Sequence, residues 1–224
     1  MNYFIFKGIS TIDYDIIVNT FPDIESSEEE GNFISIPGRD GFLFQSNDRY
    51  TELDKAITIT LKDIDNIDNI KSWLTGDGDL ILSNEIGVSY KARIVGKIKF
   101  QRSKSVWVAQ INFKTQPFGY FIKESVTLTE STQLNNPGNH SSKPIITIHG
   151  VGDITLTINS KNIVLSGITD YITLNSEIEE AYRDLVNMNN YMIGEFPIFD
   201  VGINAILWIG TVSKIDITPN WRNK

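Results

Sequence analysis

Alternation of apolar and polar residues with a period of two runs through most of the chain and predicts β-strands. In AITITLK, the residues Ile57, Ile59 and Leu61 share one face while Thr or Lys lies between them, which is the pattern of a strand with one buried side. The segment YKARIVGKIKF alternates in the same way, and VWVAQINF returns after the turn-forming residues QRSKS. These segments predict a long antiparallel hairpin.

One segment, IDNIDNIKSWLTG, follows a helical period instead. Positions at intervals of three and four are Ile64, Ile67, Ile70 or Lys71, and Leu74, and Gly76 lies just past the end, where it would serve as a C-cap. The pattern predicts a single helix that lies across a sheet, with Trp73 and Leu74 facing the core.

A second series of strands begins after the turn-rich stretch NNPGNHSSKP. The segments IITIH, ITLTI, IVL, YITL, FPIF, NAILWI and VSKIDIT follow at intervals of roughly ten residues, which is typical of a β-sandwich. A turn is expected at Asn159 to Asn162. The glycines of GVG at Gly150 to Gly152 are also interpreted as a hairpin turn, because the residues after them alternate as a strand and offer no helix N-terminus to a phosphate. Two domains are therefore predicted, at residues 1–132 and 133–224.

The stretch from Asp23 to Tyr50 differs in character from the rest. ESSEEEGN is an acidic run without apolar spacing, which favours a solvated loop. SIPGRDGFLFQSNDRY follows, with one proline and two glycines around Arg39 and Asp40. A segment of this kind buries little of its own surface, so it is either a solvated loop or an arm that a neighbouring molecule orders.

The composition narrows the possible functions. The 224 residues contain no cysteine, which excludes disulfides, a thiolate nucleophile and Cys-ligated metal sites. A net charge of -8 argues against nucleic-acid binding, which requires clustered Lys and Arg. No apolar run approaches the roughly 18 residues of a membrane-spanning helix. The start MNYFIFKGIS predicts a first strand rather than a secretory signal, so a soluble protein made in the cytoplasm is expected.

No pattern of catalytic or metal-binding residues emerges. His140 and His149 are nine residues apart, which matches no helical metal pair. The sequences Asp63-x-Asp65 and Asp77-x-Asp79 lack the later glycine and glutamate of a calcium loop, and their carboxylates are expected at solvated turns or caps. A pair of carboxylates brought together from distant segments, as in glycoside hydrolases, is the one enzymatic arrangement left open. We expect no catalytic residue, no metal and no cofactor.

Several segments, which together cover essentially the whole chain, form an ordered series. They are IPGRDG at Ile36 to Gly41, IKSWLTGDGDLIL, FKTQPFGY at Phe113 to Tyr120, NNPGNHSSKPIITIHGVGDITLTIN at Asn135 to Asn159, YITLNSEIEEAYRD, NMNNYMIGEFPIFDVGINAILWIG and the terminal ITPNWR. In this order they resemble the distal tail proteins of long, noncontractile-tailed bacteriophages and prophages, chiefly of Gram-positive hosts.

The resemblance implies a mainly β fold with one helix, in which an N-terminal ring-forming domain is followed by a β-sandwich similar to galectins. It implies a structural virion protein without enzymatic activity, assembled in the host cytoplasm into a homo-hexameric ring at the distal end of the tail. The implied partners are the major tail tube protein, the tail-associated hub or lysin protein and receptor-binding proteins, with no nucleic acid and no membrane.

In that family an extended arm of the N-terminal domain embraces the neighbouring subunit, which gives the segment near residues 35–50 an expected role. A loop that a neighbour orders around a closed rotation would build a ring. The candidate inter-subunit contacts are Pro37, Gly38, Arg39, Asp40 and Gly41. A tight turn held by a local interaction of the Asp40 side chain is equally compatible with the sequence.

The alternative function is a lectin-like module that recognises host cell-wall polysaccharide. Galectin-type sites combine a cluster of His, Asn and Arg on one strand with a Trp platform, and the second half shows no such cluster in its sequence. Trp208 alternates with strand neighbours and is expected in the core. Trp221 is either an aromatic residue at a rim or a residue that packs the last strand down.

Overall fold

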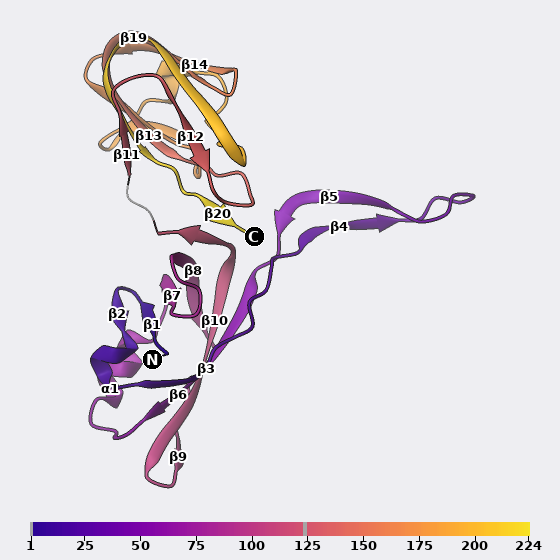
Figure 1. Cartoon of the computed structure of the whole chain (residues 1–224), viewed down its shortest axis with the longest axis vertical. Coiled ribbons are helices and arrows are strands. Elements are labelled where there is room, and N and C mark those ends of the chain that lie inside the picture. Colours follow the sequence, from indigo (N-terminus) through magenta and orange to yellow (C-terminus); the bar gives the residue numbers. More distant parts are fainter. Residues whose placement is uncertain (1, 123–124) are drawn as a thin grey trace. The chain divides into compact units, whose positions relative to one another are not determined.

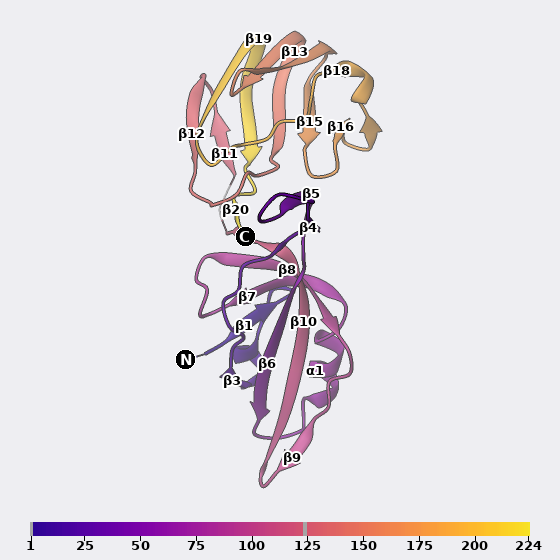
Figure 2. The ribbon, with the colours of Figure 1, turned by 90° about the vertical axis from the view of Figure 1, so that its right-hand side faces the viewer.

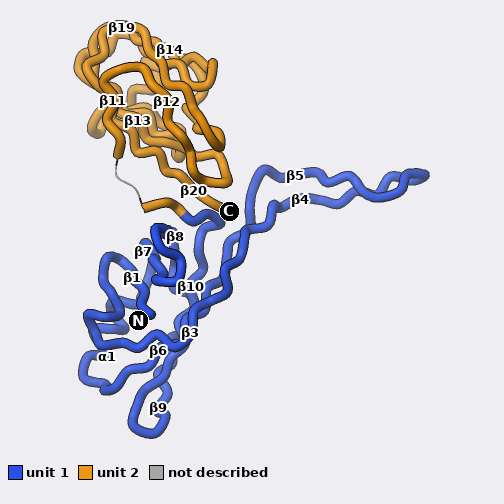
Figure 3. Tube along the Cα trace, in the orientation of Figure 1, with its two compact units in different colours: residues 1–119, 224 blue, residues 120–223 orange. Residues whose placement is uncertain are grey.

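A computed structural model describes residues 2–122 and 125–224 (Figures 1 and 2). The chain divides into two compact units, residues 1–119 with Lys224 and residues 120–223, each with its own hydrophobic core (Figure 3). The predicted fold class, mainly β with one α-helix among the described residues, is confirmed. No helix in the described part of the chain is long and apolar enough to cross a membrane.

Unit 1 is built on one sheet with the strand order β2-β1-β7-β8-β10-β6-β3. β8 and β10 are neighbours, as the predicted hairpin requires, and β9 pairs with the start of β10 at its tip. The bounds are β1 (Phe4–Phe6), β2 (Ile9–Ser10), the 3-10 helix η1 (Thr11–Tyr14), β3 (Ile17–Thr20), β6 (Leu53–Leu61), β7 (Asp77–Leu82), β8 (Val88–Val95), β9 (Gln101–Ser103) and β10 (Val106–Phe121).

The core of unit 1 follows the alternation of its strands. Ile57, Ile59 and Leu61 of β6 are all buried, as predicted. The helix α1 (Ile67–Trp73) packs on this core, because the Trp73 ring stacks on that of Phe4 at 5.8 Å between centroids. The Trp73 indole N–H also donates to the carbonyl of Phe6 at 2.8 Å. The predicted helix and its core-facing tryptophan are confirmed.

Unit 2 is a β-sandwich whose two layers share two long strands. β13 and β19 pair along most of their lengths; one half of the pair is extended by β15 and β11, and the other half by β14 and β12. The bounds are β11 (Val126–Leu128), β12 (Thr132–Asn136), β13 (Ile145–Ile158), β14 (Lys161–Ile168), β15 (Tyr171–Asn175), β16 (Glu180–Arg183), β17 (Val186–Asn187), η2 (Asn189–Tyr191), β18 (Met192–Ile193), β19 (Gly202–Thr218) and β20 (Arg222–Asn223).

Three details of unit 2 differ from the sequence predictions. The boundary predicted after residue 132 falls at the start of β12, whereas the units divide between Gly119 and Tyr120, because β11 and β12 both pair with β19. NAILWI and VSKIDIT belong to one strand, β19. FPIF does not form a continuous strand. Its Phe199 makes an isolated β-bridge with Ser142, in which the two residues exchange backbone hydrogen bonds of 2.8 and 3.0 Å.

The GVG segment is not a hairpin turn, contrary to the prediction, but lies inside β13. The register between β13 and β19 shifts after His149 and again after Val151. Such bulges bend a strand and increase its twist. IITIH and ITLTI are therefore two halves of one bent strand, and each half belongs to a different layer of the sandwich. The real hairpin turn is at Asn159 and Ser160, with φ angles of 48° and 70°, and there the predicted turn is confirmed.

Gly150 is the residue that this bend requires, because a Cβ atom there would lie 2.3 Å from the carbonyl oxygen of Thr211. We expect Gly150→Ala to lower the free energy of unfolding by about 1–3 kcal/mol, as overpacking does in a tight site. Urea unfolding measures this difference. Val151→Ala, at a side chain that is 49% exposed, is the matched control and should change stability by at most about 0.5 kcal/mol. Equal effects of the two substitutions would contradict the role of Gly150.

Candidate functional site

The strands β4 (Glu29–Ile34) and β5 (Leu43–Tyr50) form a separate two-stranded antiparallel sheet, called the arm here (residues 29–50). It extends away from the rest of unit 1 (Figure 3). At its base the Thr51 N–H donates to the carbonyl of Glu28 at 2.8 Å, which closes the hairpin. An arm is therefore present, and it is longer than the predicted segment 35–50 because it includes a strand on the N-terminal side.

That N-terminal strand corrects the prediction that the whole acidic run is a solvated loop. Glu29 and Glu30 belong to β4, and side chains of β5 contact both carboxylates. The Ser46 hydroxyl donates to the Glu29 carboxylate, and Arg49 Nε lies 3.1 Å from a carboxylate oxygen of Glu30. The glutamates are tolerated in a strand because the opposing strand supplies their partners.

The tip of the arm carries the five predicted contact residues. The Arg39 N–H donates to the carbonyl of Ile36 at 3.1 Å, and Gly38 has a φ of 80°. This is the pattern of a type II turn with Pro37 and Gly38 at its centre. The side chains of Arg39 and Asp40 are exposed, and neither makes a hydrogen bond or ion pair within the described part of the chain. The turn is held by its backbone, so a local bond of Asp40 is not what shapes it.

Three phenylalanines cluster beside this tip. Phe33 lies 4.8 Å from Phe42 and 5.0 Å from Phe44 between ring centroids. The Phe44 ring passes directly over Gly31. A Cβ atom at Gly31 would lie 2.4 Å from this ring, so glycine leaves the space that the ring needs. Phe33 and Phe42 remain 66% and 62% exposed. Clustered exposed apolar side chains mark surfaces that contact other proteins, and this aromatic cluster is a signal that the sequence analysis did not use.

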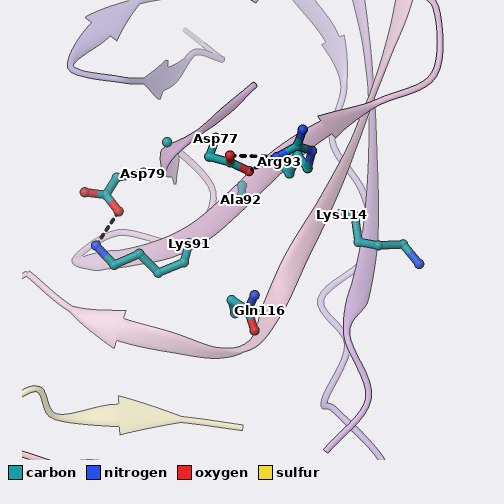
Figure 4. Close-up of a pocket in the computed structure, with 8 residues that line it drawn as sticks. Asp77, Asp79, Lys91, Ala92, Arg93, Lys114 and Gln116 are labelled. Atoms are coloured by element: carbon teal, nitrogen blue, oxygen red, sulfur yellow. Dashed lines mark hydrogen bonds and ion pairs between the residues drawn. The ribbon is translucent and has the colours of Figure 1, made fainter. Parts of the chain in front are cut away.

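A charged pocket lies on the outer face of β7, β8 and β10 in unit 1 (Figure 4). Asp77 and Arg93 are opposite one another in the register and lie 2.7 Å apart, as do Asp79 and Lys91. The two aspartates are therefore cross-strand partners of basic residues, not the turn or cap residues that the sequence suggested. Lys114 donates to Glu52 at 2.9 Å, and this bond lowers the pKa of Glu52. Because these carboxylates are each matched by a cation, the pocket has no surplus of ligands for a metal.

The side chain of His149 contacts a carboxylate on a neighbouring strand of unit 2. His149 lies within β13, and its Nε2 is 3.1 Å from the carboxylate of Asp216. Hydrogen bonds from Lys214 and Thr127 lower the pKa of Asp216. Within residues 2–122 and 125–224, no three His, Cys, Asp or Glu side chains gather in a way that could hold a metal ion.

Both tryptophans of unit 2 pack against its core. Trp221 is 4% exposed, and its ring lies 5.2 Å from that of Phe199. Of the two possibilities for Trp221, packing of the last strand is therefore the one realised. Trp208, which was predicted to be a core residue, packs against the same core but is only partly buried. Because Trp221 is buried, its ring cannot be the stacking platform of a galectin-type site.

One buried polar network escaped the sequence analysis. Lys55 Nζ lies 3.2 Å from a carboxylate oxygen of Glu85, with the two side chains 2% and 8% exposed. The Tyr90 hydroxyl donates to the same carboxylate, and burial together with this bond raises the pKa of Tyr90. The sequence alternation of β6 could have indicated that Lys55 is buried, since Lys55 lies two residues from both Leu53 and Ile57 and therefore on the same, core-facing side of the strand.

No family model matches the chain, and no curated protein matches it by sequence. Among solved structures, the crystal structure of the Dit protein (gp 19.1) of phage SPP1 has a TM-score of 0.73 with 15% sequence identity, over 97% of this chain and 98% of that one. That protein is described as a paradigm of the hub adsorption apparatus in phages that infect Gram-positive bacteria. The resemblance to phage distal tail proteins predicted from the sequence is thus confirmed at the level of the fold, which this chain shares with the SPP1 Dit protein.

Proposed function

We propose that this protein is a structural component of a phage tail, which forms a homo-hexameric ring at the distal end of the tail. The ring would join the major tail tube protein to the tail-associated hub or lysin protein and to receptor-binding proteins. The observation that carries this proposal is the arm with its exposed aromatic cluster, on a fold shared with a phage hub protein. The protein acts by assembly in the virion, without catalysis or a cofactor.

The arm supplies the physical reason for a ring. An isolated two-stranded hairpin is at best marginally stable in water, and none of the arm's residues belongs to the described core of unit 1. A neighbouring copy that covers Phe33 and Phe42 would bury the apolar surface that this copy cannot bury itself. Because the arm and its receiving surface are different patches, the contact is heterologous, and repetition around a closed rotation gives a ring.

The candidate contact residues at the tip fit this arrangement. Pro37, Gly38 and Gly41 fix the shape of the turn, while Arg39 and Asp40 offer one charge of each sign to a neighbour. Static light scattering of the purified chain tests the proposal, which predicts a mass six times that of one chain, 25.3 kDa. A monodisperse monomer at all concentrations, alone and with the tube protein, would contradict it.

Substitution of the exposed aromatic residues should separate assembly from folding. We expect Phe33→Ser combined with Phe42→Ser to convert the ring into monomers, because buried aromatic anchors at interfaces each contribute about 2 kcal/mol or more. The melting temperature of the monomer should hardly change, since both side chains are exposed. Sedimentation velocity and circular dichroism measure the two properties.

The matched control for these aromatic substitutions is Ile24→Ser. Ile24 is 70% exposed and lies in unit 1 but outside the arm, so this variant should still form rings. If the aromatic double variant assembled as well as Ile24→Ser, the cluster would have no part in the interface.

A further inference from the structure

The tip of the arm contains one of the two Asp-Gly pairs in the chain. These pairs are Asp40-Gly41 at the tip and Asp77-Gly78 in β7, and the sequence contains no Asn-Gly pair. An aspartate followed by glycine rearranges without an enzyme when the chain is able to bend, because glycine has no side chain to shield its main-chain nitrogen from the neighbouring carboxyl group. The two pairs share this chemistry, so only their surroundings in the fold distinguish them.

At the tip, the fold places no restraint on the reacting groups. Asp40 and Gly41 are both exposed, and they lie between the strands β4 and β5. Within residues 2–122 and 125–224, no hydrogen bond holds the Asp40 carboxylate or the Gly41 N–H. A Cβ atom built on Gly41, whose φ is 85°, would meet nothing within 4 Å. The carboxyl carbon of Asp40 is therefore able to approach the Gly41 nitrogen by rotation within the loop, as is typical of exposed loop tips.

In β7 the same pair of residues is restrained. Asp77 and Gly78 are both paired with β8 in the sheet. Arg93 Nη1 donates to the two carboxylate oxygens of Asp77 at 2.8 and 2.7 Å. The side chain of Lys7 covers Gly78, since a Cβ atom there would lie 2.4 Å from it. Reaction of the carboxyl group with the next nitrogen would require this part of β7 to leave the sheet, and paired strands open only at a cost in free energy.

We propose that Asp40-Gly41 is a site of spontaneous isomerisation of aspartate to isoaspartate. The Gly41 nitrogen attacks the carboxyl carbon of Asp40, the new C–N bond closes a succinimide ring, and the N–H proton leaves with the carboxyl hydroxyl as water. Water then adds to one of the two ring carbonyls. Opening at the side-chain carbonyl restores aspartate, whereas opening at the main-chain carbonyl breaks the original peptide bond and leaves isoaspartate. One water leaves and one returns, so no oxidant, reductant or other reactant is needed.

The product has a different main chain at the tip of the arm. In isoaspartate the chain runs through the side-chain carbonyl, which lengthens the main chain by one carbon atom, and the carboxylate is attached directly to Cα. Both the spacing of the tip and the position of its negative charge therefore change. The consequence for assembly rests on the proposed function: if the tip contacts a neighbouring copy, an isomerised tip no longer matches that contact, and chains that wait unassembled lose the ability to join a ring.

The test is prolonged incubation at neutral pH of the full-length chain and of its Phe33→Ser with Phe42→Ser variant, in which a neighbour should not cover the tip. Cleavage after glutamate yields residues 31–52 and 53–85 as separate peptides, and mass spectrometry with electron-transfer fragmentation distinguishes the isomers. We expect isoaspartate at Asp40 to exceed that at Asp77 by about tenfold or more, a ratio that an opening free energy of about 1.4 kcal/mol in β7 produces. Absence of isoaspartate at Asp40 from both samples, or equal amounts at Asp40 and Asp77, would overturn the proposal.

Asp40→Glu is the matched control, because it keeps the charge while its longer side chain closes the corresponding larger ring far more slowly. This variant should contain no isomerised residue at position 40 and should assemble after incubation as it does when fresh. Light scattering of the incubated samples keeps the modification apart from the ring. If the unaltered chain never exceeds the mass of one copy, the proposed ring fails while isoaspartate at Asp40 still supports the site. Rings that form equally well from isomerised protein and from Asp40→Glu would refute the effect on assembly.

Discussion

Excision of residues 30–49, with Glu29 joined to Tyr50 through Asn-Gly, is expected to leave a folded monomer in place of a ring. Glu29 and Tyr50 face each other in the register, and the Thr51–Glu28 backbone bond holds the chain ends together below them. A two-residue type I′ turn therefore closes the gap without strain. The core of unit 1 loses no residue, so the melting temperature should stay close to that of the unaltered chain while light scattering reports the mass of one copy.

A shorter excision separates the tip from the strands. Replacement of residues 36–41 by Asn-Gly removes the five candidate contact residues but keeps Phe33 and Phe44. If the tip itself contacts the neighbour, this variant should form rings only at higher concentration. A hexamer that persists after the full excision would show that the arm does not hold the ring together.

The second large effect is expected at the buried ion pair. Glu85→Ala should lower the free energy of unfolding by about 3–5 kcal/mol, because it leaves the Lys55 ammonium buried without a counter-charge. Lys55 is 2% exposed and cannot turn outward to water without leaving the core face of β6. The Tyr90 hydroxyl also loses its acceptor. Urea unfolding followed by circular dichroism measures the change.

Two further variants test whether the loss of stability in Glu85→Ala comes from an unpaired buried charge. Removal of both charges in Lys55→Met with Glu85→Gln should restore most of the lost stability, since apolar or neutral replacements of buried pairs are often tolerated. Lys91→Met breaks an exposed pair with Asp79, 62% and 54% exposed, and should change stability by at most about 1 kcal/mol. If Glu85→Ala were no more harmful than Lys91→Met, the pair would not be effectively buried.

The local pattern of apolar residues correctly predicted the strands and the helix that bury one face against the core. The alternation around Ile57 identified β6 and its buried side, and the helical spacing before Gly76 identified α1 with Trp73 turned to the core. Both predictions succeed because side-chain direction repeats every two residues in a strand and about every 3.6 in a helix, whatever the rest of the chain does.

The errors occurred where the same local pattern fits two structures. A Gly-Val-Gly between two alternating segments is compatible with a hairpin turn and with a bulge inside one strand, and only the pairing of β13 with the distant β19 decides between them. The glutamates of β4 suggested a loop because their partners Ser46 and Arg49 lie on the opposite strand of the arm. No prediction was made for Lys55, because its partner Glu85 comes from a turn thirty residues later.

By itself, the sequence determined the mainly β fold, the single helix, the odd character of the segment before Tyr50 and the resemblance to phage distal tail proteins. Only the tertiary structure decided that the arm is a two-stranded hairpin with an aromatic cluster, that unit 2 shares two bent strands between its layers, and that Lys55 pairs with Glu85 in a buried site. The physical reason is range: the direction of a side chain is a property of its own segment, whereas a partner, a register or a pocket depends on segments that meet only when the chain has folded.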